Sequence, residues 1–228
     1  DGNEVWLIAA GGSLFFAFPK RYASSFSGFY LPLTIVLWLL IGRALGIELR
    51  KHVDNKLWKS FWDVVFSISS LLLVVFFGAA LGNIIRGVPL EANGYFFEAL
   101  WTTFTVVPYS GIVDWFTVLM SVVAVATLMV HGANFLSMKT TGELQTSARI
   151  ISKRFNPLVI LLSLVMFAAT TYIRPELWNN YFNHVWGFIF PLTGMAGLAG
   201  MFYFRSKDSD GKAFLSSAVF ILGMMSGT

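Results

Sequence analysis

The sequence contains no cysteine among its 228 residues. This absence excludes disulfide bonds, thiolate metal sites and cysteine nucleophiles together. Charged residues are also scarce, at 12% of the chain, whereas soluble domains carry roughly 25%. Hydrophobic residues make up 56%, and many of them stand in long runs. The composition therefore indicates a protein of the lipid bilayer.

The sequence also lacks the patterns of soluble chemistry. It shows no Ser-His-Asp cluster, no metal-ligand spacing and no phosphate-binding loop, so we expect no metal site. Its charged loops are too short for a nucleic-acid surface, and no nucleic-acid partner is expected. Gly194, Gly197 and Gly200 follow no predicted strand and lie inside an apolar run, which predicts close packing between helices.

Seven apolar segments are long enough to be considered as membrane spans, since a helix needs about 20 residues to cross the hydrocarbon core. They cover residues 3–18, 26–47, 62–85, 113–138, 157–173, 184–204 and from about 213 onward. The sequence therefore predicts an all-α, polytopic transmembrane helix bundle, with residues 1–228 as a single transmembrane domain.

The orientation follows from the basic residues between these segments. The connections after the second, fourth and sixth segments carry 12 of the 16 Lys and Arg residues, and the alternate connections carry 4. Basic loops stay on the cytoplasmic side. We therefore expect the Asp1 end to lie at the cytoplasmic side.

Two connections carry further signals. The outer connection, residues 86–112, is rich in Tyr and Trp, which settle at the level of the headgroups. We expect part of it to form an interfacial helix anchored by Trp101 and Trp115; a cofactor or partner surface is the alternative. On the cytoplasmic side, residues 140–155 predict an amphipathic surface helix that begins at a capping box over residues 140–143 and meets anionic headgroups.

Three titratable side chains are candidates for function. Asp1 and Glu4 open the first apolar segment, where an acidic residue is either a helix cap or a functional group. His131 lies well inside the fourth segment, where a histidine can ligate haem iron or relay protons. His52 and His184 belong to loops, so neither is placed to be a second ligand. We therefore expect His131 to make a polar contact between helices.

Several motifs together resemble one membrane-protein family. In chain order they are Asp1-Gly2-Asn3-Glu4-Val5-Trp6, Ala10-Gly11-Gly12, Phe18-Pro19, Phe26-Ser27-Gly28-Phe29-Tyr30-Leu31-Pro32-Leu33, His131-Gly132-Ala133, Lys139-Thr140-Thr141-Gly142-Glu143-Leu144 and Arg149. With these residues the sequence resembles subunit II of the bd-type quinol oxidases. Because that subunit is an eight-helix protein, seven segments lead us to expect a fragment that lacks the first helix and the C-terminal end.

The resemblance implies a haem-free partner subunit of a terminal oxidase in the prokaryotic inner membrane. Haem b and haem d are expected in the partner, subunit I, where quinol electrons reduce O₂ to water and proton-motive force is generated. Subunit I, quinol and membrane lipid are the expected partners. The resemblance does not decide whether a small single-helix subunit is present or whether this chain binds a quinone.

For this chain the resemblance implies a role in the assembly of the complex and a contribution to a proton path from the cytoplasm. It places the proton entry at Asp1, and Glu4 is added because it lies one helical turn inward on the same face. A secondary transporter or channel with intramembrane carboxylates is the alternative, although no internal repeat relates the two halves of the sequence.

Overall fold

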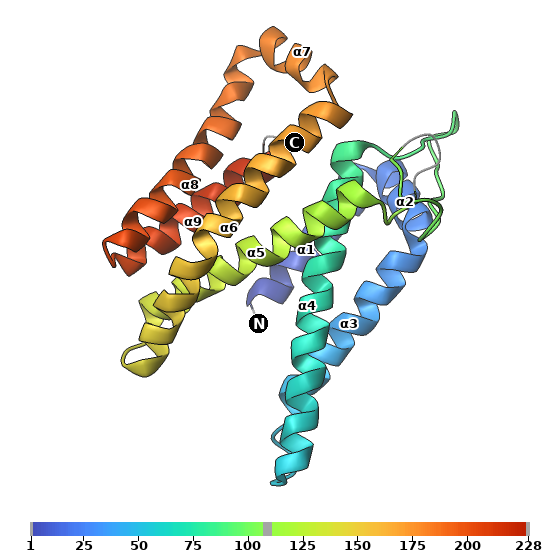
Figure 1. Ribbon diagram of the computed structural model, residues 1–228. Coiled ribbons are helices and arrows are strands. Elements are labelled where there is room, and N and C mark those ends of the chain that lie inside the picture. The colour runs from blue at the N-terminus through green and yellow to red at the C-terminus, as the bar shows by residue number, and fades with distance from the viewer. Residues whose placement is uncertain (1, 107–110, 227–228) are drawn as a thin grey trace. The chain divides into compact units, whose positions relative to one another are not determined.

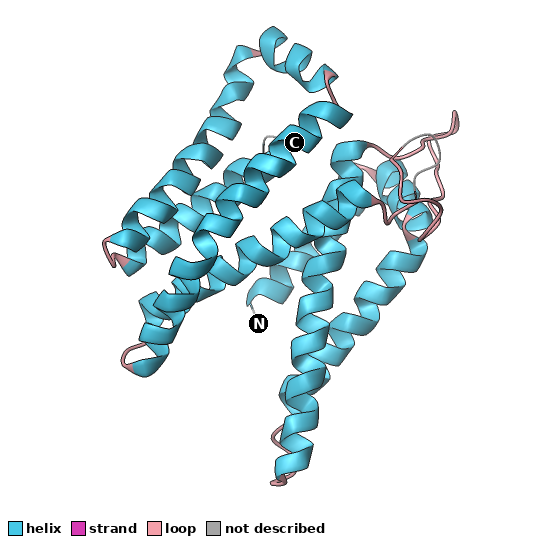
Figure 2. Cartoon of the chain, viewed as in Figure 1, coloured by secondary structure: helices cyan, strands magenta, loops and turns pink. Residues whose placement is uncertain are grey.

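The computed structural model describes residues 2–106 and 111–226, apart from the side chains of residues 2–4 and 7. Every regular element in these ranges is helical, and none is a strand (Figure 2). In chain order (Figure 1) the elements are α1 Gly2–Ala17, α2 Pro19–Gly28, α3 Tyr30–Leu49, α4 Lys56–Arg86, α5 Trp115–Lys139, α6 Glu143–Ile173, α7 Glu176–Asn183, η1 Val185–Phe188, α8 Ile189–Ser206 and α9 Asp210–Ser226. The predicted all-α fold is confirmed.

Five helical stretches among the described residues are long and apolar enough to cross a membrane. They are Tyr30–Leu49, Lys56–Arg86, Trp115–Lys139, Glu143–Ile173 and Val185–Ser206. Large apolar side chains such as Trp38, Leu72 and Leu164 are exposed on them, which suits a surface in contact with acyl chains. A polytopic membrane helix bundle is thereby confirmed. The two other predicted spans correspond to the shorter helices α1 and α9, whose crossing of the membrane stays a prediction.

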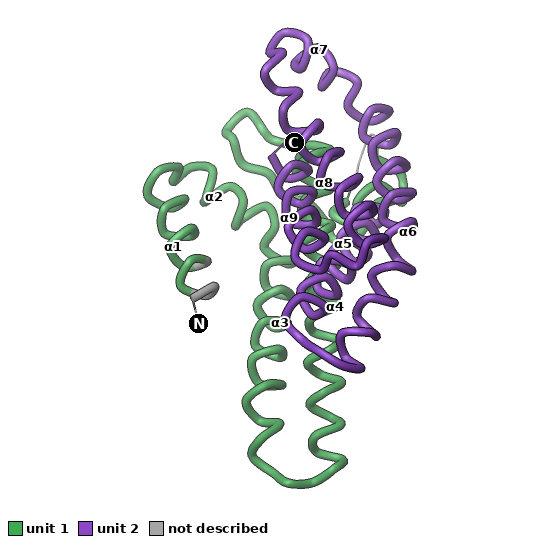
Figure 3. The backbone as a smooth tube through the Cα atoms, turned by 90° about the vertical axis from the view of Figure 1, so that its left-hand side faces the viewer, with its two compact units in different colours: residues 1–117 green, residues 118–228 purple. Residues whose placement is uncertain are grey.

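The chain divides into two compact units, residues 1–117 and 118–228 (Figure 3). Unit 1 holds α1 to α4 and the connection that follows them, and unit 2 holds α6 to α9 with all but the first turn of α5. The organisation of the whole chain as a single domain stays a prediction.

In unit 1 the helices α3 and α4 lie side by side (Figures 1 and 3). Gly46 permits this approach, because a Cβ at that position would stand 3.0 Å from Cβ of Phe66. Asn55 begins α4 as its N-cap, and its Oδ1 accepts a hydrogen bond from the Leu57 amide at 2.8 Å. The pair is therefore defined by a local cap and by one close backbone approach.

The predicted segment 26–47 is divided in the structure, since α2 ends at Gly28 and α3 begins at Tyr30. Pro32 explains the break, because it has no N–H to donate to the carbonyl of Gly28 four residues earlier. The Glu98 amide lies 3.4 Å from that carbonyl and takes the place of the missing donor. The connection after α4 is thus fixed to the end of α2, where the chain turns into α3.

The core of unit 2 is an apolar cluster contributed by four helices. Its buried members are Ala126, Val130, Val159, Met201 and Phe220. The prediction that the glycines of α8 permit close packing is confirmed. A Cβ at Gly197 would collide with the backbone of Phe220 in α9, and one at Gly200 would stand 2.8 Å from Oγ of Ser216.

Two expectations about the connections are wrong in the described residues. No separate amphipathic helix covers residues 140–155, because α6 continues without a break from Glu143 through Pro157. The capping box does not form either: Gly142 is the N-cap, with no side-chain cap bond, while Thr140 Oγ1 bonds back to the Leu136 carbonyl at 2.6 Å. The connection after α4 contains no helix in its described part, so the expected interfacial helix is absent there.

Candidate functional site

The two predicted proton-path residues lie at the start of the chain. Asp1 lies outside the described residues. Glu4 belongs to α1 by its backbone, but its side chain is not among those described. The role assigned to both residues therefore stays a prediction.

His131 lies on α5 and is partly buried in unit 2. Its Nδ1 is 2.8 Å from Oγ of Ser217 on α9, and its ring stacks on Phe214 with the centroids 4.9 Å apart. Ser217 is 1% exposed and donates in turn to the Phe214 carbonyl at 2.7 Å. The imidazole is thus held in a polar and aromatic contact between two helices.

The described residues do not fit the axial ligation of a haem by two histidines. His52 is an exposed residue of unit 1, with Nδ1 3.1 Å from the Glu48 carbonyl. His184 is an exposed residue after α7, with Nδ1 3.3 Å from the Asn180 carbonyl. Within the described ranges, no three His, Cys, Asp or Glu side chains gather as a metal-binding group.

A charged cluster joins three helices in unit 2. Asp210, the first residue of α9, is paired with Arg149 of α6 and with Arg205 in the last turn of α8. Arg149 Nε donates to Asp210 Oδ1 at 3.1 Å, and Arg205 Nη1 donates to Oγ of Ser137 on α5 at 3.2 Å. The hydrogen bond from Arg149, with that from Arg205, lowers the pKa of Asp210 from 3.8 to about 2. Asp210 is therefore a permanent anion near neutral pH.

A chain of buried polar side chains continues this cluster between the helices. Ser137 donates to the Asn134 carbonyl at 2.9 Å, and Ser152 of α6 donates to Asn134 Oδ1 at 2.6 Å. All three residues are 0% exposed. Hydrogen bonds at this depth fix the register of α5 against α6, because any slip leaves a buried polar group without a partner.

Unit 1 contains a second buried charged cluster, at the end of α4. The Arg86 guanidinium is paired through Nη2 with Glu98 and through Nη1 with Asp114. It also donates to Asn83 Oδ1 at 2.7 Å and to the Gly111 carbonyl at 2.9 Å. Glu98 is 3% exposed and Asp114 is 0% exposed. One cation thus holds two carboxylates away from water.

The two carboxylates differ in the number of hydrogen bonds that their oxygens accept. Asp114 Oδ1 accepts from the amides of Phe116 at 2.7 Å and Thr117 at 2.9 Å, so Asp114 caps the start of α5. Glu98 Oε2 is buried and accepts no hydrogen bond from the described residues. Burial raises the pKa of Glu98, against the attraction of Arg86. Burial without a full set of hydrogen bonds therefore favours the protonated form of Glu98.

Sequence reasoning missed both clusters. It counted Arg86 and Arg205 only as loop charges, and it gave no role to Glu98 or Asp210. A signal existed for Arg86, since it is the only basic residue of residues 86–112. In the basic loop after α3 the charges stay at the surface instead: Arg50 Nε lies 2.6 Å from Asp63 Oδ1, with both side chains half exposed.

Comparison with known proteins matches residues 1–228 to the family described as cytochrome bd terminal oxidase subunit II. A probable cytochrome oxidase subunit 2 of Haemophilus influenzae is 39% identical over 178 residues, which cover 76% of this chain and 44% of that protein. Cytochrome bd-I ubiquinol oxidase subunit 2 of Escherichia coli (strain K12) is 36% identical over 168 residues, covering 74% and 42%.

Cytochrome bd ubiquinol oxidase subunit 2 of Bacillus subtilis is 31% identical over 180 residues, which cover 79% of this chain and 50% of that protein. The chain thus spans half or less of the length of these relatives. The chain belongs to the cytochrome bd terminal oxidase subunit II family.

Proposed function

We propose that this chain is part of a helical subunit of a quinol:O₂ oxidoreductase in a prokaryotic plasma membrane. In this complex quinol electrons reduce O₂ to water and the reaction generates proton-motive force. The observation that carries the proposal is the family match over residues 1–228, together with relatives that are named as ubiquinol oxidase subunits. The five apolar helices support a membrane location.

Haem b and haem d belong, in this proposal, to the partner subunit I. The histidines of this chain support that division, because His131 is engaged with Ser217 and Phe214, and His52 and His184 are exposed. This chain then contributes to the assembly of the complex and forms part of its surface that faces the lipid. The buried polar contacts of α5, α6, α8 and α9 support such a role, because they give the bundle one defined packing.

The chain also contributes part of a proton path from the cytoplasm, with Asp1 at its entrance and Glu4 one turn inward. A carboxyl group at the edge of the hydrocarbon has its pKa raised by desolvation, so it can accept and pass on a proton near neutral pH. The basic connections after α3, α5 and α8 support a cytoplasmic position for the Asp1 end.

A visible spectrum is the first test. The complex is purified through a tag on this chain, and its absorption is recorded before and after dithionite. Haem b and haem d bands are expected. A folded, intact preparation without colour would overturn the oxidase assignment and favour a transporter or channel.

The proton path is tested in the assembled complex with Asp1→Asn and Glu4→Gln. Removing a relay carboxyl is expected to lower quinol oxidation and proton uptake together by about tenfold or more. Glu143→Gln is the matched control, since Glu143 is an exposed carboxylate in the first turn of α6. Full turnover and full proton uptake in both variants, with normal haem content, would refute the path and leave the oxidase assignment intact.

A further inference from the structure

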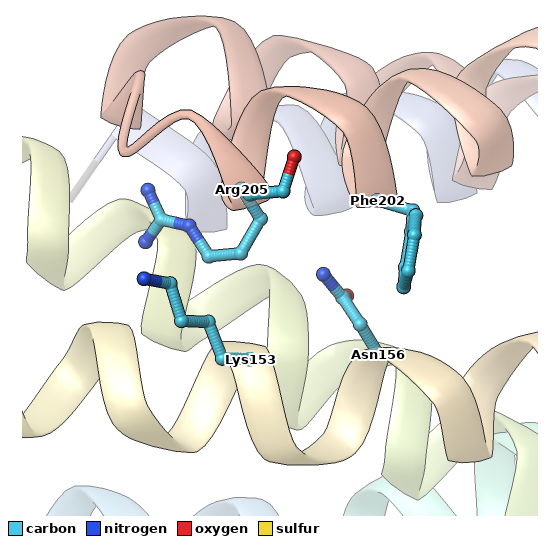
Figure 4. Close-up of a pocket in the computed structure, with 5 residues that line it drawn as sticks. Lys153, Asn156, Phe202 and Arg205 are labelled. Carbon is cyan, nitrogen blue, oxygen red and sulfur yellow. The ribbon is translucent and has the colours of Figure 1, made fainter.

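Unit 2 contains a pocket of about 280 Å³ between α6 and α8 (Figure 4). Lys153 and Asn156 line it from α6, and Phe202, Arg205 and Ser206 line it from α8. The charged ends of Lys153 and Arg205 lie together at one end of the pocket, and Asn156 and Phe202 lie at the other. One end of the pocket is therefore cationic, and the other end is lined by an amide and an aromatic ring.

Two of the lining side chains carry polar atoms that the protein leaves unsatisfied. Arg205 and Asn156 are each 1% exposed. Among the described residues, Arg205 Nε finds no acceptor and Asn156 Oδ1 finds no donor. Buried polar atoms almost always have a partner, so such a pair beside a cavity points to a bound group. That group must accept from Arg205 and donate to Asn156.

The charge around the pocket favours an anion. Arg149 and Arg205 share the single carboxylate of Asp210. Lys153 Nζ lies 3.0 Å from Asp208 Oδ1, with both side chains about half exposed. Three cations thus face two carboxylates, and one positive charge remains. Because the pair of Lys153 and Asp208 is exposed, it is weak and Lys153 can turn to another anion.

The position of the pocket along α6 indicates a lipid rather than a soluble anion. Lys153 and Asn156 stand where the charged first turns of α6 end, and the apolar run begins at Pro157. Phe202 is 51% exposed beside the pocket, and Leu161 is 59% exposed further along α6. An acyl chain that covered Phe202 would place its headgroup beside the cations of the pocket.

We propose that this pocket binds the headgroup of an anionic phospholipid that carries free hydroxyl groups, of the phosphatidylglycerol type. The phosphate accepts hydrogen bonds from Arg205 Nε and Lys153 Nζ, and a headgroup hydroxyl donates to Asn156 Oδ1. The site is independent of the proton path and of the oxidase assignment, because it rests on the residues of the pocket and on the ion pairs around it, all within unit 2.

Lipid retention in the purified complex tests this site. The complex is loaded with deuterium-labelled phosphatidylglycerol in detergent and washed, and the label retained per chain is counted by mass spectrometry. Lys153→Gln is expected to retain about tenfold less label, since a hydrogen bond to a charged group is lost. Arg154→Gln is the matched control, because Arg154 is the exposed neighbour of Lys153 and does not line the pocket.

Asn156→Leu removes the acceptor at similar size and is expected to abolish the preference for labelled phosphatidylglycerol over labelled phosphatidylcholine. Equal retention in the Lys153 and Arg154 variants, or equal retention of the two lipids by the unmodified chain, would overturn the proposal. Complete displacement of the label by excess inorganic phosphate would assign the pocket to free phosphate and overturn the lipid. If Asn156→Leu does not assemble, the Lys153 and Arg154 pair decides alone.

Discussion

The buried charged clusters of the two units have opposite ratios of cations to carboxylates. In unit 1 a single guanidinium, that of Arg86, holds the carboxylates of Glu98 and Asp114. In unit 2 the guanidiniums of Arg149 and Arg205 share the single carboxylate of Asp210. The excess charge is therefore negative in the first cluster and positive in the second.

This difference determines which group can change its charge. An excess carboxylate in a buried site can neutralise itself by taking up a proton, and burial raises the pKa of Glu98 accordingly. An excess guanidinium has no such route, because it stays protonated at all accessible pH values. The unit 2 cluster thus keeps its charge, and its surplus is available to an external anion. The unit 1 cluster instead contains a carboxylate, Glu98, whose pKa is raised by burial.

Arg86→Gln is expected to have the largest effect. It leaves two buried carboxylates without their cation, and breaking a buried ion pair on one side costs about 3–5 kcal/mol. Thermal unfolding of the detergent-solubilised complex measures this loss. Arg50→Gln is the control, because it breaks an exposed pair with Asp63 and is expected to leave the midpoint unchanged. Equal midpoints for the two variants would show that the Arg86 cluster does not stabilise unit 1.

Asp210 is expected to produce an intermediate effect that depends on pH. Its pKa is about 2 in the folded chain, below its ordinary 3.8. The stabilisation is therefore complete above about pH 4 and is lost as the pH falls through about 2, with a total of roughly 2 kcal/mol.

Unfolding midpoints between pH 6 and pH 3 measure the first part of this loss. Asp210→Asn is expected to start lower at pH 6 and to lose less on acidification than the unmodified chain. Asp63→Asn serves as the exposed control and is expected to retain the acid sensitivity contributed by Asp210. An acid slope that Asp210→Asn leaves unchanged would assign the sensitivity to another carboxylate.

Local signals were sufficient to predict much of the fold. The long apolar runs predicted the helices, and Asp114 could be identified as a cap because its partners, the amides of Phe116 and Thr117, are two and three residues away. The predicted segment 26–47 ran across the division at Phe29. Pro32 is a local signal for a break there, whereas the amide of Glu98, which takes the place of the missing donor, lies far along the chain. A local sequence pattern can indicate the proline break but not the distant contact.

The charged clusters could not be predicted for the same reason. Asp114 lies 28 residues from Arg86, and Asp210 lies 61 residues from Arg149. The sequence indicates that such charges exist, but only the tertiary fold pairs them and removes them from water. Counting Lys and Arg for the orientation treated Arg205 as a loop charge, whereas its side chain is 1% exposed between helices.

Glu98→Gln is expected to have the smallest effect and to test the comparison most directly. Burial raises the pKa of Glu98 above its ordinary 4.5, so the folded chain binds this proton more tightly than the unfolded chain does. The contribution of Glu98 to stability is thus complete below about pH 4.5 and is lost as the pH rises through the folded pKa.

Glutamine keeps an oxygen for Arg86 and carries no charge, so the variant is expected to lose this alkaline slope and to differ from the unmodified chain by less than about 1 kcal/mol at pH 7. Unfolding midpoints from pH 4 to pH 9 measure the slope. Glu91→Gln is the control, since Glu91 is an exposed carboxylate of the same connection and is expected to leave the slope unchanged. A slope that survives in Glu98→Gln would mean that both carboxylates stay ionised beside Arg86. In that case the sign of the excess charge would not decide which cluster binds a proton.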